Sequence, residues 1–288
     1  MPPASDVWVQ GHQVDDEELQ FLSKKYSLDY SVLHDVLDKN ELPRVEVKDG
    51  VIYVFVRSVQ RGKHSKVITT PVLLAVSDTV FVSLSVADDA DRTLTKPELL
   101  EGVFDPAGLL LATFVSIISE YEELIQRTAR YVHDTGQRLR THEVTNDDFI
   151  RFVTVEDNLN EYKMNLAATQ AVAERLRETV TDKTHKEAID DVLLYVRQLL
   201  VAIDSYNQSV TSIRNAYGTI ANNVLNQRMK TLTVLTVLIA LPNVVYGMYG
   251  MNVNLPFQEQ PWVYGVIVTF SVSIIFLVFS IGRKRGIF

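Results

Sequence analysis

The sequence of 288 residues contains no cysteine, and this absence excludes several kinds of site. Disulfide bonds, thiolate zinc centres, iron–sulfur clusters and thiol nucleophiles all require that residue. Residues that interrupt helices are also missing over long stretches, since no proline lies between Pro106 and Pro242 and no glycine between Gly136 and Gly218. Such a tract without helix breakers predicts long helices.

Residues that are charged at neutral pH are absent from two stretches near the C-terminus, 231–258 and 260–282. Each stretch exceeds the roughly 20 residues that a helix needs to cross a membrane. Core helices of soluble proteins seldom run this long without a charged face, so we predict two transmembrane helices rather than two buried ones. The predicted membrane part consists of a first span at about 230–250, an outer loop at 251–261, a second span at about 262–282 and a basic cytoplasmic tail at 283–288.

Charge is divided unevenly along the chain. Of the formal net charge of −8, residues 231–288 contribute +2 and residues 1–230 contribute −10. Basic residues precede the first span and follow the second, whereas the connecting loop has none. The positive-inside rule therefore places both termini in the cytoplasm of a multi-pass protein of the plasma or inner membrane. The acidic cytoplasmic part argues against nucleic-acid binding.

The cytoplasmic part shows a change of pattern near residue 105. Before it, two short helical patterns near 15–25 and 29–39 precede alternating β-branched runs, and Asp49-Gly50 between two of these runs is a hairpin signal. The predicted fold class is an α+β cytoplasmic domain followed by long helices and two C-terminal transmembrane helices. The predicted domains are an α/β domain at 1–105, long cytoplasmic helices with the start of a stalk helix at 106–228 and a transmembrane domain at 229–288. The predicted long helices are 107–141, 146–181 and 186–250.

Two stripes with a period of 3.5 residues run along the last of these helices. The first stripe is apolar and predicts a packed seam; it consists of Val192, Val196, Leu199, Ile203, Tyr206, Val210, Ile213, Tyr217, Ile220 and Val224. The second stripe is uncharged, and its residues are mostly small or carry an amide or hydroxyl group. It consists of Ser205, Gln208, Ser212, Asn215, Thr219, Asn222, Asn226, Met229, Thr233, Thr236, Ala240, Asn243, Gly247 and Gly250.

The uncharged stripe has two interpretations. A solvated helix face normally contains lysine and glutamate, so a face without them indicates the lining of a pore. Alternatively, its small residues only allow close helix packing in the membrane, and its polar residues form an ordinary wet face. Because two spans cannot enclose a pore, a channel requires several copies of the chain around one axis. Without a G-x-x-x-x-G-K-[ST] loop or a nucleophile–base motif, we expect neither ATP-driven transport nor an enzyme.

The first span ends in Tyr249-Gly250-Met251-Asn252, which resembles the signature of the CorA family of divalent metal ion transporters. The motif lies at the outer end of the penultimate span, before a short loop and a basic C-terminus, and the resemblance extends over the entire chain. It implies a funnel-shaped homopentamer whose first spans line the pore and whose selectivity filter consists of Gly250, Met251 and Asn252. The pore-lining residues are then Asn226, Met229, Thr233, Thr236, Ala240, Asn243 and Gly247.

The resemblance also implies regulation by the transported ion. Asp35 and Asp191 correspond to a pair of aspartates that share a regulatory magnesium site between subunits. The expected function is a channel that moves hydrated Mg²⁺ down its electrochemical gradient and is gated by intracellular Mg²⁺, with Co²⁺ and Ni²⁺ as further candidate ions. Mg²⁺ prefers oxygen ligands and loses its water reluctantly, which suits an oxygen-rich stripe. The expected partners are divalent cations, membrane lipid and further copies of the chain.

Two alternatives to a magnesium channel remain open. Zinc carriers of the same family share the Gly-Met-Asn ending, although the six histidines of this chain lie outside the spans and have no clustered ligand spacing. A membrane-anchored sensor that relays a signal without conducting ions is the alternative from another class. The uncharged stripe and the Tyr-Gly-Met-Asn ending favour a pore over a sensor.

Overall fold

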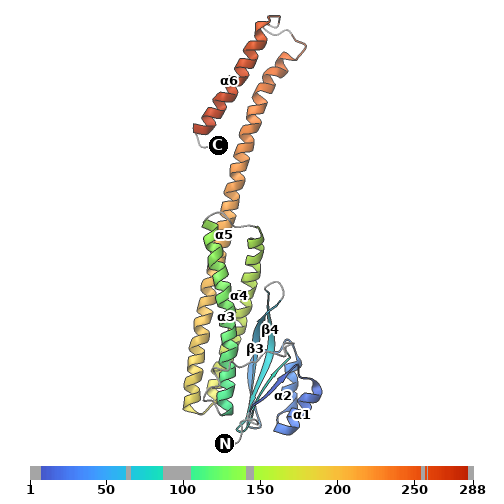
Figure 1. The fold of residues 1–288 in the computed structure, drawn as a ribbon, viewed down its shortest axis with the longest axis vertical. Coiled ribbons are helices and arrows are strands. Elements are labelled where there is room, and N and C mark those ends of the chain that lie inside the picture. Colours follow the sequence, from blue (N-terminus) through green and yellow to red (C-terminus); the bar gives the residue numbers. More distant parts are fainter. Residues whose placement is uncertain are drawn as a thin grey trace. The chain divides into compact units, whose positions relative to one another are not determined.

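The computed structural model describes residues 8–62, 66–86, 105–140, 146–253, 257 and 259–284 (Figure 1). Its chain forms two compact units, Met1–Arg214 and Asn215–Phe288. The strands are β1 (Trp8–His12), β2 (Arg44–Lys48), β3 (Val51–Arg61), β4 (Val67–Val76) and β5 (Phe81–Ser85). The helices are α1 (Asp16–Tyr26), α2 (Tyr30–His34), the 3-10 helix η2 (Asp35–Leu37), α3 (Pro106–Arg140), α4 (Asn146–Thr179), α5 (Lys183–Tyr249) and α6 (Trp262–Lys284).

The five strands form one sheet in the order β1-β5-β4-β3-β2, in which only β1 and β5 are parallel. In the β2–β3 hairpin, Lys48 pairs with Val51, so Asp49 and Gly50 form a two-residue turn. Both turn residues have positive φ, 52° and 82°, as this kind of tight hairpin requires. The hairpin predicted at Asp49-Gly50 is therefore confirmed, whereas β1 was not predicted.

The sheet of the first unit is covered on both faces, because neighbouring residues of its strands point in opposite directions. On β3, Val54 and Val56 belong to a core shared with α3, α4 and α5. Tyr53 and Phe55 belong to a second core shared with α1 and α2. All four side chains are buried. The layers of this unit are thus α1 and α2, the sheet, and the three long helices (Figure 1).

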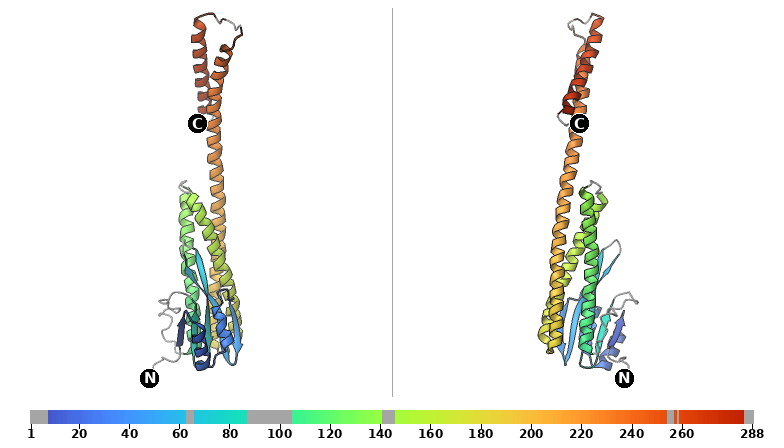
Figure 2. Two further views of the ribbon diagram at one scale, coloured as in Figure 1. Left: turned by 90° about the vertical axis from the view of Figure 1, so that its right-hand side faces the viewer. Right: turned by 60° about the vertical axis from the view of Figure 1, so that its left-hand side comes forward.

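The long helices begin and end close to the predicted positions, within three residues at every end. In the first unit, α3, α4 and the beginning of α5 run side by side (Figure 2). Carboxylates set where two of them begin: Asp105 accepts a hydrogen bond from the Gly108 N–H (2.9 Å), and Asp182 accepts one from the His185 N–H (3.0 Å).

Hydrogen bonds join the long helices of the first unit to its sheet. The Tyr121 hydroxyl of α3 donates to the carbonyl oxygen of Arg57 on β3 (2.9 Å), and the Val67 N–H of β4 donates to Asn158 Oδ1 of α4 (3.0 Å). Burial raises the pKa of the Tyr121 phenol far above its ordinary value, so this hydroxyl stays a donor at any physiological pH.

The second unit contains the C-terminal part of α5 together with α6. Both helices are long and apolar enough to cross a membrane. In the most apolar 18-residue window, 0% of α5 and 11% of α6 is buried. Large apolar side chains such as Leu235, Val244 and Phe276 are more than half exposed. A core helix of a soluble protein would bury these side chains, so the exposure agrees with the prediction of two spans.

Candidate functional site

The two stripes of α5 occupy opposite sides of the helix. Each uncharged position from 205 to 226 lies two residues after a seam position, which is about 200° around an α-helix. In the first unit, seam residues such as Val196, Ile203 and Val210 are completely buried against α3 and α4. Every member of the uncharged stripe, from Ser205 to Gly250, is exposed. The seam is therefore confirmed as a packing surface from Val192 to Ile213, whereas its last residue, Val224, is exposed. The uncharged stripe is exposed and can make other contacts.

Hydroxyl groups on the stripe present their oxygen atoms outward. Thr233 Oγ1 donates to the Met229 carbonyl (2.8 Å), and Thr236 Oγ1 donates to the Leu232 carbonyl (2.9 Å). Because each hydroxyl hydrogen is used within the helix, the oxygen can only accept further hydrogen bonds from outside. Water molecules bound to a cation point their hydrogens outward. These threonines can therefore hydrogen-bond to the water shell of a cation.

Pro242 interrupts the hydrogen bonding of α5 without ending the helix. Proline has no N–H, so the Leu238 carbonyl lacks its ordinary helical donor. The exposed amide of Asn243 follows directly, and the exposed Ala240 lies on the same stripe. On the side of the uncharged stripe, this part of the helix offers the amide oxygen of Asn243.

The residues predicted as the selectivity filter follow directly after the end of α5. The Gly250 N–H donates to the carbonyls of both Tyr246 (3.0 Å) and Gly247 (3.2 Å), which closes the last turn. Met251 and Asn252 come next in a bend and are exposed. A Cβ atom added to Gly247 would meet nothing within 4 Å, so a glycine is not required there by contacts within the chain. A single chain carries one copy of this turn, and a filter formed by several copies stays a prediction.

Asp35, one of the two predicted regulatory residues, is already engaged in an ion pair. Its Oδ2 lies 2.6 Å from Arg44 Nη2. Arg44 also pairs with Glu41 and lies 3.7 Å from Glu46, so three carboxylates surround one guanidinium group. Asp191 is exposed near the start of α5. Among the residues that the structure describes, no group of three or more His, Cys, Asp or Glu side chains could hold a metal ion.

The two predicted regulatory aspartates lie on opposite sides of the sheet. Asp35 directly precedes Val36, which belongs to the core of α1 and α2. Asp191 directly precedes Val192, which belongs to the core of the long helices. Asp35 therefore belongs to the layer of α1 and α2, and Asp191 belongs to the layer of the long helices. That they share a regulatory ion stays a prediction.

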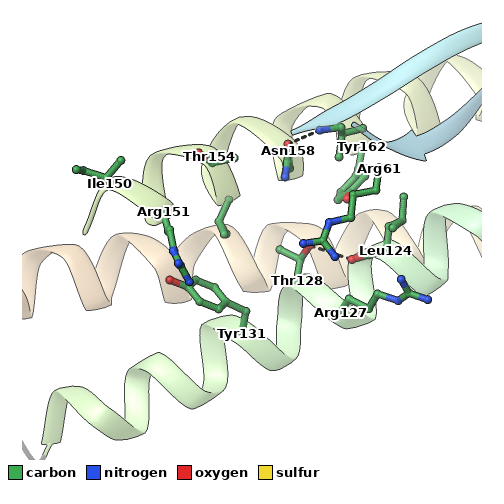
Figure 3. Close-up of a pocket in the computed structure, with 12 residues that line it drawn as sticks. Arg61, Leu124, Arg127, Thr128, Tyr131, Ile150, Arg151, Thr154, Asn158 and Tyr162 are labelled. Carbon is green, nitrogen blue, oxygen red and sulfur yellow. Dashed lines mark hydrogen bonds between the residues drawn. The ribbon is translucent and has the colours of Figure 1, made fainter. Parts of the chain in front are cut away.

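Sequence reasoning missed one further feature of the first unit, a cavity of about 640 Å³ between α3, α4 and the strands β3 and β4 (Figure 3). Three arginines line it: Arg61, Arg127 and Arg151. They come from three segments that are far apart in the sequence, and no local pattern connects them.

Comparison with known sequences finds relatives over nearly the whole chain. The family profile described as CorA-like Mg²⁺ transporter protein matches residues 4–283. The cobalt/magnesium transport protein CorA of Methanocaldococcus jannaschii is 25% identical over 294 residues, which cover 97% of this chain and 90% of that protein.

Solved structures agree with the fold. The complete structure of the CorA magnesium transporter from Methanocaldococcus jannaschii matches with a TM-score of 0.84 at 22% identity and covers 98% of this chain and 91% of that one. The full-length CmaX protein matches with a TM-score of 0.73 at 15% identity, covering 94% of this chain and 88% of that one. The predicted fold class, an α+β domain followed by long helices and two C-terminal apolar helices, is thereby confirmed.

Proposed function

The chain belongs to the CorA-like Mg²⁺ transporter family, and on this premise we propose that it conducts hydrated Mg²⁺ through a membrane pore lined by α5. The observation that carries the proposal is the uncharged stripe, which is exposed along its whole length and ends at the Tyr-Gly-Met-Asn motif. An exposed face that only met water would be expected to carry lysine or glutamate.

The proposed pore is an assembly of five copies of the chain. In it the first spans surround one axis and turn their uncharged stripes inward, and the apolar side chains on the other sides of the spans face lipid or neighbouring helices. Both termini then lie in the cytoplasm and the 251–261 loop outside, in a plasma or inner membrane. In this arrangement, the apolar side chains exposed on the second unit contact lipid instead of water.

Conduction in this pore needs no dehydration of the ion. Asn252 amide oxygens and nearby carbonyls would accept hydrogen bonds from the water shell at the outer mouth, and Thr236 and Thr233 would do so further in. The stripe has no carboxylate that would hold a divalent cation too tightly for it to leave. The membrane potential supplies the driving force, about 4.6 kcal/mol for a divalent ion at about 100 mV.

Regulation is proposed at contacts between adjacent subunits. There, Asp35 of one copy and Asp191 of the next would share a Mg²⁺ ion when the cytoplasmic concentration is high, which would favour a closed state. Arg44 is a built-in competitor, because its guanidinium group occupies Asp35 when no ion is bound. The double variant Asp35→Asn, Asp191→Asn should keep conducting at high internal Mg²⁺. Inhibition as strong as in the wild type would remove both residues from the mechanism.

Uptake into liposomes tests the transport proposal itself. The purified protein is reconstituted, a potential is set, and Mg²⁺ uptake is measured alone and in competition with Co²⁺, Ni²⁺ and Zn²⁺. Saturable Mg²⁺ uptake that rises with the potential is the expected result. Zn²⁺ uptake that Mg²⁺ does not inhibit would instead identify a zinc carrier, and absence of flux for every ion would indicate a sensor.

A further inference from the structure

The arginine-lined cavity of the first unit lies between two layers of the fold. β3 and β4 supply Arg61 and Val67, α3 supplies Arg127 and Tyr131, and α4 supplies Arg151 and Asn158. Figure 3 shows Arg61 entering between the two helices and Arg151 reaching across from α4 toward the Tyr131 ring. The volume of about 640 Å³ lies within the range of about 300–1,000 Å³ that is typical of small-molecule sites.

The cavity is positively charged within an acidic part of the chain. It has three arginines, and none of the described residues that line it is acidic. Asp148 is the carboxylate that reaches its edge, where the Tyr131 hydroxyl lies 3.5 Å from Asp148 Oδ1. That carboxylate is paired with Arg138 (2.8 Å), which does not line the cavity. Residues 1–230 carry a net charge of −10, and three guanidinium groups around one hollow therefore indicate an anionic ligand.

The apolar and aromatic walls between the arginines suit an anion that also has an apolar or aromatic body. Val67 and Val155 are buried apolar residues at the cavity, and the side of the Tyr131 ring adds an aromatic surface. Arg127 and Arg151 are exposed, so their N–H groups can be reached from solution. Arg61 is exposed as well but already has a partner within the chain, so it contributes mainly its positive charge. Guanidinium groups bind phosphate oxygens in pairs of parallel hydrogen bonds, a geometry that a lysine cannot provide.

We propose that this cavity binds a small phosphate ester with an apolar or aromatic body, of which a nucleoside monophosphate is the simplest probe. Its phosphate contacts the guanidinium groups, and its ring lies against Tyr131 and the apolar wall. Because α3, α4 and the sheet all contribute to the cavity, the bound ligand ties these elements together and stabilises the first unit by mass action. The site does not depend on whether the second unit conducts ions.

Binding to the full-length protein in detergent tests this site directly. Isothermal titration calorimetry, with free Mg²⁺ held constant, compares AMP, inorganic phosphate and adenosine. AMP should bind more tightly than phosphate, and adenosine should not bind measurably. Arg151→Gln should weaken AMP binding about tenfold, the loss expected for one charge-assisted hydrogen-bonding group. Arg127→Gln is a second exposed variant with the same expectation.

Arg130→Gln is the matched control, because it removes the same charge from the helix that carries Arg127. Arg130 is exposed but does not line the cavity. It should bind AMP as the wild type does. Three results would overturn the proposal: no AMP binding by the wild type, equal weakening by Arg130→Gln and Arg151→Gln, or inorganic phosphate binding as tightly as AMP. Transport is not measured in this experiment, so its outcome leaves the proposed pore untouched.

Discussion

Thr233 and Thr231 form a matched pair that tests which side of α5 meets the ion. Both are exposed, and each hydroxyl donates to a carbonyl of its own helix, Thr233 to Met229 (2.8 Å) and Thr231 to Gln227 (3.0 Å). They differ in position, because two residues correspond to about 200° around the helix. Thr233 lies on the uncharged stripe, and Thr231 lies in a groove on the other side with residues such as Leu235.

Replacing either threonine by valine keeps the shape of the side chain and removes one hydrogen-bond acceptor. If one of the five Thr233 oxygens of the proposed pore accepts a hydrogen bond from the hydrated ion at the highest barrier, the loss of that bond costs about 0.5–1.5 kcal/mol. That energy corresponds to a decrease in flux of between about 2-fold and about 13-fold. Thr231→Val loses an oxygen that the ion never meets, so its flux should equal that of the wild type.

Mg²⁺ uptake into liposomes, normalised to the amount of assembled protein, is the appropriate assay for both variants. Size-exclusion chromatography in detergent verifies that both assemble like the wild type. Equal flux in the two variants, or a larger decrease in Thr231→Val, would refute the assignment of the uncharged stripe to the pore.

Two further predictions concern the segment that carries Asp35. Asp29 caps α2, because its carboxylate accepts a hydrogen bond from the Val32 N–H (3.1 Å). The same carboxylate forms an ion pair with Lys48 (2.5 Å). Both contacts, the ion pair most strongly, hold the pKa of Asp29 below its ordinary value. Asp29→Ala should therefore lower the free energy of unfolding by about 0.5–2 kcal/mol at neutral pH. Denaturation curves should show the difference shrinking as pH falls below about 4, where the carboxyl of the unfolded chain becomes protonated, and vanishing once pH has also passed the lower pKa of the folded state. A difference that grows toward low pH would contradict this sign. Arg44→Ala removes the guanidinium group that competes with Mg²⁺ for Asp35. Such a partly exposed ion pair is worth up to about 1 kcal/mol, so the internal Mg²⁺ concentration that half-inhibits uptake should fall by up to about 5-fold. An increase in that concentration would contradict the proposed regulatory site.

Most of the fold could be predicted because its signals are local. A helix without breakers, a run of alternating β-branched residues and an Asp-Gly turn each depend on neighbouring residues, and the structure has the corresponding elements. β1 escaped prediction because its partner is distant. Trp8 pairs with Phe81, and its indole N–H donates to Ser83 Oγ (3.1 Å), so the strand is stabilised by residues more than seventy positions away. Nothing in the short β1 sequence itself marks it as a strand.

The candidate site could be predicted only where one helix carries it. The uncharged stripe was recognisable because its residues repeat along α5. The ion pair of Asp35 with Arg44 was not foreseen, because the chain between these residues leaves the helix and turns before β2 begins. The arginine-lined cavity could not be predicted either, because its three arginines come together only when the helices pack against the sheet. A ring of filter residues depends on contacts between chains, which no single-chain pattern specifies.

The proposed pore depends most directly on Asn252, and one measurement tests it. Mg²⁺ uptake by liposomes containing Asn252→Ala is compared with uptake by Gln260→Ala, which removes another exposed residue with an amide from the loop between α5 and α6. With assembly intact in both variants, Asn252→Ala should fall to the level of empty liposomes, and Gln260→Ala should match the wild type. Wild-type uptake by an assembled Asn252→Ala protein would contradict the proposal that this residue forms the selectivity ring of a magnesium pore.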